Sequence, residues 1–285
     1  AGAFGILEAK VPPIAMLEYF YAKDGTVIGR SVNGKMQNYS YDKKGQLIAV
    51  IDAATNEPVE RYIYDPAGNI LSKTINGKTT SYKYDKANQL VSSTCDGKTT
   101  KYEYDAAGRL VKEGTKSYSY GYLGKVLSVY EDGEDIASFT YHMDGQIATA
   151  KTKGGTESFL WDGLALISRN SVQYINEPYV TGGNPILAND KVLFNDILGT
   201  TLGIQSDKYE PIQRDAFGAY VQLDSFRSKF GLSFMAFGTV DGDGIFRPAE
   251  YTLFPTVGSH LSDSACRADT VQLCDNAGGM RFYRG

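Results

Sequence analysis

The stretch RYIYDPAGNILSKTINGKTTSYKYDKANQLVSSTCDGKTTKYEYDAAGRL, residues 61–110, contains nearly the same unit three times: YIYDPAGNI, YKYDKANQL and YEYDAAGRL. In each unit two tyrosines lie two positions apart, so they point to the same face of a β-strand. An aspartate follows, and a glycine (asparagine in one copy) stands three residues after it, which is typical of a type I turn. Each unit therefore predicts two strands joined by a tight turn.

Further copies extend this pattern in both directions. YFYAKDGTV (19–27) and YSYDKKGQL (39–47) precede the three units, while the degraded copies YSYGYLGKV (118–126), FTYHMDGQI (139–147) and FLWDGLAL (159–166) follow them. The period is about 20 residues, which indicates a repeat architecture. The residues that define the motif are Tyr39, Tyr41, Asp42, Gly45, Tyr62, Tyr64, Asp65, Gly68, Tyr82, Tyr84, Asp85, Asn88, Tyr102, Tyr104, Asp105 and Gly108.

A second kind of turn separates successive units. It carries Asn-Gly or Asp-Gly at positions 33–34, 76–77, 96–97 and 132–133, and these pairs are the strongest signals for two-residue hairpins. Eight repeats then give roughly 16 strands, and a sheet of that width curls or closes. We expect an all-β fold in which a long antiparallel meander of repeated hairpins is rolled into a curved or spiralling β-shell.

The repeat pattern also divides the chain. We expect a lead-in segment at 1–18, a repeat wall at 19–166, a degenerate all-β region at 167–263 and a variable tail at 264–285. KVLFNDILGTTLGIQ (191–205) and YEPIQRDAFGAYVQL (209–223) are typical of two further hairpins. Because the first residue is Ala rather than Met, we also expect a processed product or a piece of a longer protein.

Composition argues against several classes of protein. The formal net charge is −4, so the basic excess that neutralises phosphates is missing, and we expect no nucleic-acid partner. No apolar run approaches the roughly 20 residues that cross a bilayer, so we expect no membrane span. Cys266 and Cys274 either form a disulfide in an exported protein or remain free thiols, and Cys95 stands alone. We predict neither a cofactor nor a metal site.

The repeat residues have two interpretations. The tyrosines could stack on glycans, but aromatic pairs packed across strands explain their recurrence beside the turn residues. The aspartates at 42, 65, 85, 105 and 162 could form an acidic array, but a turn aspartate accepts backbone N–H groups and needs no other role. For both residue types we favour the structural interpretation.

Candidates for chemistry outside the repeats are few. DGDG (241–244) does not continue into an EF-hand calcium loop, so it indicates a turn. His142 occupies the aspartate position of a degraded repeat, and nothing in the sequence builds a catalytic triad around His260. We favour a chain with no catalytic residues.

The repeat units resemble the YD repeats of RHS-repeat proteins. VLFNDILGTTLGIQ (192–205) and YEPIQRDAFGAY (209–220) resemble the start of the RHS-associated core region, and residues 234–263 are similar to its later part. The resemblance implies a large hollow β-shell that often encloses a variable C-terminal toxin. It also implies a secreted or surface-exposed bacterial protein, and a core region that frees the enclosed domain by self-cleavage in many members. For such a cleavage Asp241, Asp243 or Asp263 could supply a carboxylate pair that shares a proton.

The sequence departs from the family pattern in three respects. It has several hundred residues fewer than a closed shell uses, it lacks the cleavage-type boundary motif after the core, and only 22 residues follow Asp263. We therefore expect a non-enzymatic shell or scaffold of a secreted bacterial protein that encapsulates, carries or displays another segment, of the polymorphic-toxin type. The alternatives are an extracellular structural or adhesive module that self-assembles through exposed β-edges or binds glycans, and a self-cleaving aspartic-type core.

Overall fold

The computed structural model describes residues 15–122, 124–152, 155–163, 165–178, 185–196, 201–205 and 207–217, together with the strand residues 238–240 and 246–248. The regular elements of these residues are all strands. They are β1 (Leu17–Tyr21), β2 (Val27–Val32), β3 (Lys35–Tyr41), β4 (Leu47–Asp52), β5 (Pro58–Tyr64), β6 (Ile70–Ile75), β7 (Lys78–Tyr84), β8 (Leu90–Cys95), β9 (Lys98–Tyr104), β10 (Leu110–Glu113), β11 (Lys116–Tyr120), β12 (Val126–Glu131), β13 (Glu134–Tyr141), β14 (Ile147–Thr152), β15 (Gly155–Asp162), β16 (Ala165–Arg169), β17 (Val172–Asn176), β18 (Pro185–Ala188), β19 (Lys191–Asn195), β20 (Thr201–Gln205), β21 (Tyr209–Pro211), β22 (Gly238–Val240) and β23 (Phe246–Pro248).

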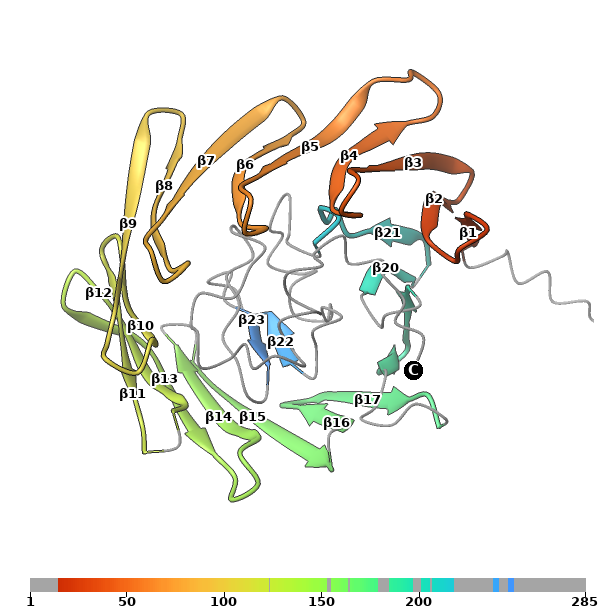
Figure 1. The fold of residues 1–285 in the computed structure, drawn as a ribbon. Coiled ribbons are helices and arrows are strands. Elements are labelled where there is room, and N and C mark those ends of the chain that lie inside the picture. The colour runs from red at the N-terminus through yellow and green to blue at the C-terminus, as the bar shows by residue number, and fades with distance from the viewer. Residues whose placement is uncertain are drawn as a thin grey trace, which may run out of the picture.

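The strands β1 to β21 form one antiparallel sheet of 21 strands. Each strand pairs with the next one along the chain, from β1 with β2 to β20 with β21. Figure 1 shows that this meander curves into a ring, so that β20 and β21 return to the side of β2 to β4. The predicted all-β meander, rolled into a curved shell, is therefore confirmed.

The wider turn of each repeat has a type I bend followed by a left-handed residue. In the repeat at 39–47, the N–H of Gly45 donates to the carbonyl of Asp42 at 2.9 Å, and Gly45 has a φ of 76°. The carboxylate of Asp42 accepts the N–H groups of Lys44 and Gln46, each at 2.8 Å. Asn88 takes the glycine position of its own repeat with a φ of 59°, a conformation that asparagine tolerates.

The narrower turn has two successive left-handed residues. Asn76 and Gly77 have φ values of 49° and 81°, and Asp96 and Gly97 have values of 50° and 75°. Two positive φ angles in a two-residue loop define a type I′ turn, whose twist matches that of the flanking strands. The Asn-Gly and Asp-Gly pairs therefore connect one repeat to the next.

Every repeat also carries a β-bulge at the same place. In β4, Tyr41 pairs with Leu47 and Ser40 pairs with Ala49, so Ile48 is an extra residue on that strand. The same shift occurs in ten hairpins, and the extra residue is always aliphatic: Ile28, Ile48, Leu71, Val91, Val111, Leu127, Ala148, Ile167, Ile186 and Leu202. Since a bulge bends its strand and increases the local twist, ten bulges in register curve the sheet.

One face of the sheet, here called the inner face, holds the core. It carries the first aromatic residue of each unit and the aliphatic residue after the wide turn, and it contains Glu60, Tyr62 and Lys73. Burying one such aliphatic or aromatic side chain contributes about 1.5–3 kcal/mol. The buried members of these two positions are Val27, Tyr39, Leu47, Tyr62, Ile70, Tyr82, Leu90, Tyr102, Leu110, Tyr118, Val126, Phe139, Ile147, Phe159, Leu166, Tyr174 and Leu193.

The hairpin geometry continues past residue 166, where the sequence pattern fades. Tyr174 in β17 and Leu193 in β19 are buried at the position of the first aromatic residue, and each is followed by a bulged hairpin partner. The sheet therefore runs without a change of architecture from the recognisable repeats into the degenerate region.

Candidate functional site

In six of the units the second aromatic residue links its own hairpin to the preceding one. The hydroxyl of Tyr64 donates to the carbonyl of Leu47 at 2.7 Å, across the gap between two successive hairpins. The acceptor is always the first aliphatic residue after the wide turn of the preceding hairpin. We call this contact the inter-repeat clamp, and its tyrosine pairs are Tyr41–Val27, Tyr64–Leu47, Tyr104–Leu90, Tyr120–Leu110 and Tyr141–Val126.

Other donors make the same clamp in the later hairpins. Trp161 donates its indole N–H to the carbonyl of Ile147 at 2.8 Å. The side-chain amides of Asn176 and Asn195 donate to the carbonyls of Leu166 and Pro185, at 2.9 and 2.6 Å. Reading the sequence for aromatic pairs misses these asparagines, although they stand two positions after a core residue in YIN and LFN.

The first tyrosine of each unit is covered. Tyr62 and Tyr82 are each only 3% exposed, and burial raises the pKa of both phenols well above the ordinary value. A ring that stacks on a sugar has to present its face to the ligand, and these rings are packed inside the wall. Their position supports the structural interpretation of the tyrosine ladder.

The repeat aspartates are engaged in their own turns. Asp105 accepts the backbone N–H groups of Ala107 and Arg109, and its second oxygen accepts the Nε–H of Arg109 at 2.7 Å. Burial would raise the pKa of Asp105, but the hydrogen bonds from Arg109 and Ala107 outweigh it and hold the pKa below the ordinary value. His142 likewise forms a turn, since its carbonyl accepts the N–H of Gly145 at 3.0 Å.

Several predicted residues lie outside the described part of the chain. They are Asp241, Asp243, His260, Asp263, Cys266 and Cys274. The carboxylate pair and the disulfide therefore remain predictions. Cys95 is a free thiol at the end of β8.

Sequence reasoning missed a buried cluster of charges where the ring meets its own end. The closing segment, residues 212–217, follows β21 and contacts the inner face of β5 and β6. Lys73 and Asp215 form an ion pair of 2.9 Å, with side chains 8% and 2% exposed. The carboxylate of Glu60 accepts the N–H of Ala216 at 3.0 Å.

Two aromatic residues complete this contact. The hydroxyl of Tyr62 donates to the same oxygen of Glu60 at 2.5 Å, and the rings of Tyr62 and Phe217 lie 4.7 Å apart. Lys73 pairs with Tyr62 across β5 and β6, so both side chains point to the inner face. We call Glu60, Tyr62, Lys73, Asp215 and Phe217, with the backbone of Ala216, the seam.

The seam perturbs one carboxyl group strongly. Burial, and next the nearby charge of Asp215, raises the pKa of Glu60 to about 7, although hydrogen bonds from Tyr62 and Ala216 oppose the shift. Glu60 is thus protonated in a large fraction of molecules near neutrality. A neutral Glu60 beside the Lys73–Asp215 pair leaves the cluster electrically balanced.

A hollow of about 460 Å³ adjoins the seam. Its lining comes from both ends of the sheet, with Arg30 and Lys35 from β2 and β3 and Tyr209 and Arg214 from β21 and the closing segment. The two ends of the ring therefore lie against each other, as Figure 1 also shows.

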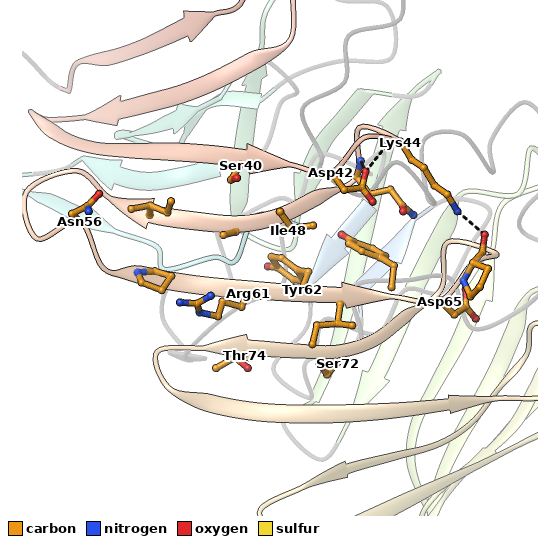
Figure 2. A pocket seen from close by; sticks show the side chains of 17 residues that line it. Ser40, Asp42, Lys44, Ile48, Asn56, Arg61, Tyr62, Asp65, Ser72 and Thr74 are labelled. Atoms are coloured by element: carbon orange, nitrogen blue, oxygen red, sulfur yellow. Dashed lines mark hydrogen bonds between the residues drawn. The ribbon is translucent and has the colours of Figure 1, made fainter.

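A second, open groove of about 950 Å³ crosses β3 to β6, as Figure 2 shows. The charged groups at the turn end of the groove, Asp42, Lys44 and Asp65, are engaged in the turns, while Arg61 lies in the middle of β5. Lys44 donates its ammonium to the carbonyl of Pro66 at 2.9 Å, and the carboxylate of Asp65 accepts the backbone and side-chain amides of Asn69. The groove therefore forms part of the wall surface and ties two neighbouring turns together.

The described residues contain no group of three or more His, Cys, Asp and Glu side chains that could hold a metal ion. Within the same residues, no helix is long and apolar enough to span a membrane.

The fold and the repeated clamp define a class of protein, the YD-repeat β-shells. The model of the family Teneurin YD-shell matches residues 22–160, which hold the recognisable repeats, so this part of the chain consists of RHS/YD repeats. The predicted family is therefore confirmed. A search of the curated proteins found no match to the sequence.

Two solved structures share the fold. The Photorhabdus luminescens Tc holotoxin pore with the mutation TccC3-D651A gives a TM-score of 0.61 at 14% identity, covering 93% of this chain and 17% of that chain. TcdB2-TccC3 without its hypervariable C-terminal region gives 0.60 at 14% identity, covering 93% and 18%. The chain therefore spans less than a fifth of the length of either structure.

Proposed function

We propose that the chain is a non-enzymatic shell segment of a secreted bacterial protein, and that it encapsulates, carries or displays another polypeptide. The observation that carries this proposal is the continuous wall of 21 strands, which curves into a ring with its aromatic core on the inner face. A wall of this kind separates an interior from the solvent.

The comparisons add support at the level of the fold. One structural neighbour is a Tc holotoxin pore, and the other, TcdB2-TccC3, is a protein whose C-terminal region is hypervariable. The described side chains of this chain are also used structurally, because the repeat tyrosines clamp hairpins together and the repeat aspartates hold turns. A polymorphic-toxin type of carrier agrees with both observations.

A protection assay tests the proposal. A flexible peptide with one site for a specific protease is fused after residue 285, and a matched control carries the same peptide before residue 1. We expect the C-terminal site to be cleaved at least ten-fold more slowly than the N-terminal one. Equal cleavage rates would contradict encapsulation. The intact mass of the unfused chain tests in addition for self-cleavage by Asp241, Asp243 or Asp263.

A second candidate function is self-assembly, as in an extracellular structural or adhesive module. Among the described residues, β1 pairs with β2 only, so its other edge has no strand partner there. Phe20 and Tyr21 of this strand are 42% and 51% exposed. An open edge with apolar side chains invites pairing with another chain.

The oligomeric state decides between the two candidates. If self-assembly is the function, light scattering will show oligomers of the wild-type chain at micromolar concentration and monomers of a Phe20→Lys variant. Monomers of both proteins would exclude assembly through β1.

A further inference from the structure

The seam differs in kind from every other contact between neighbouring parts of the wall. From β1 to β21, each strand is joined to the next by a ladder of backbone hydrogen bonds. In the described residues, β21 pairs with β20 only, and β1 with β2 only. The ends of the ring therefore meet through side chains rather than through a ladder.

We propose that the seam is a latch, the point at which the wall opens, and that the buried pair of Lys73 and Asp215 holds it closed. Opening at any other place would break a ladder of several backbone hydrogen bonds and expose core residues on two strands. Opening at the seam breaks no backbone ladder among the described strands, although it separates the Lys73–Asp215 pair, the Ala216–Glu60 hydrogen bond and the Tyr62–Phe217 contact and uncovers the buried Asp215. This inference concerns where the wall opens and does not depend on what it encloses.

A buried ion pair is suited to a contact that opens and closes. Two buried charges lose their hydration when the seam closes, and their mutual attraction offsets much of that cost, so the pair contributes little net free energy. Both charges return to water when the seam opens. An aliphatic contact of the same size would oppose opening more strongly because its exposure to water has no such compensation.

The same logic predicts a large effect when only one partner is removed. Without Lys73, Asp215 is a buried carboxylate at 2% exposure that faces a second carboxyl group, Glu60. The Asp215 carboxylate would keep the N–H of Phe217 at 3.0 Å but lose its cationic partner, and removing one partner of a buried ion pair is strongly unfavourable. The closing segment can relieve this cost by leaving the inner face. Removing both charges together should leave the seam closed.

Hydrogen–deuterium exchange of the whole chain tests the latch. The informative amide is that of Ala216, which donates to Glu60 across the seam, whereas the amide of Ile212 donates to Leu202 on its own side of the seam. In Lys73→Met we expect the Ala216 amide to exchange at least ten-fold faster than in the wild type, while the amides of β8 and β9 keep their rates. In the double variant Lys73→Met/Asp215→Asn we expect the wild-type rates to return.

The matched control breaks an exposed ion pair instead. Lys78 and Asp96 lie 2.9 Å apart with side chains 63% and 69% exposed, so Lys78→Met should change no rate near the closing segment. Unchanged exchange at Ala216 in Lys73→Met would overturn the proposal. Faster exchange throughout β1 to β21 would also overturn it, because the seam would then not open separately from the wall. Failure of the double variant to recover would show that charge balance does not hold the latch.

Discussion

Removing one hydroxyl from the inter-repeat clamp should measurably weaken the wall. Tyr64 donates to the carbonyl of Leu47 at 2.7 Å, and Leu47 itself has no exposed surface. Tyr64→Phe keeps the ring but removes the donor and leaves a buried carbonyl without its partner. A net hydrogen bond is worth about 1 kcal/mol, and the unsatisfied acceptor adds to the loss, so we expect the free energy of unfolding to fall by about 1.5 kcal/mol.

The repeat offers an internal test of this magnitude. Tyr104 makes the same bond to Leu90 at 3.0 Å, two hairpins further along, and the two clamps share no residue. Tyr104→Phe should therefore cost a similar amount. The double variant should lose about 3 kcal/mol, because changes at distant and independent sites add.

Urea denaturation followed by circular dichroism measures these differences as shifts of the midpoint at constant slope. The control is Tyr122→Phe, since the side chain of Tyr122 is fully exposed. That substitution should change the free energy of unfolding by less than about 0.5 kcal/mol. If Tyr64→Phe costs no more than Tyr122→Phe, the clamp does not hold neighbouring hairpins together.

Four other perturbations test separate parts of the structure. The pKa of Glu60 is about 7 in the folded chain and 4.5 ordinarily, so the folded chain holds a proton there that the unfolded chain releases. The free energy of unfolding should therefore fall as the pH rises from 4.5 to about 7. Glu60→Gln should remove this fall in denaturation curves measured at each pH. Asp105→Ala deletes the turn acceptor of Ala107 and Arg109 and should cost about 1 kcal/mol in urea denaturation, whereas an unchanged midpoint would contradict the turn role. Gly97→Ala should lower the free energy of unfolding by about 1 kcal/mol in the same assay, because alanine is strained at a φ of 75°. Backbone strain is the whole of this cost, because no atom lies within 4 Å of the added methyl group. Deleting residues 85–104, one whole repeat, should keep the β-sheet signal in circular dichroism but abolish the slow exchange of the Ala216 amide. Retained protection of that amide would show that the seam does not depend on the number of repeats.

The residues that make the turns could be recognised in the sequence because their chemistry is local. Asp42 and Gly45 act within four residues of each other, and Asn76-Gly77 forms its turn alone. Local chemistry repeated with a fixed period then fixes the succession of strands. For this reason the all-β meander followed from the sequence.

The bulges and the later clamps were harder to see. A pair such as Leu47-Ile48 reads as two ordinary strand residues, although only Leu47 belongs to the inner face and Ile48 is 36% exposed. Asn176 and Asn195 keep the donor of the clamp without the aromatic ring. The residue types of the repeat change along the chain, whereas a hydrogen-bond donor persists at a fixed place in each hairpin.

The seam could not be predicted at all, because its two halves are 142 residues apart. The only signal lay in β5 and β6, where alternation places the charged residues Glu60 and Lys73 on the face that carries Tyr62. A charge at a core position of a repeat indicates a partner from elsewhere. It does not say which residue supplies that partner.

The bulges connect the local pattern to this distant contact. Each bulge bends its strand, so the curvature of the wall accumulates with the number of hairpins. Asp215 can reach Lys73 only if that accumulated curvature brings the end of the sheet back onto β5 and β6. Removing one repeat displaces the closing segment by two strands, about 10 Å, which is far beyond the reach of an ion pair. The ten bulges and the Lys73–Asp215 pair therefore depend on each other. The bulges set the curvature that determines where the sheet ends, and the ion pair forms only when the sheet ends beside β5 and β6.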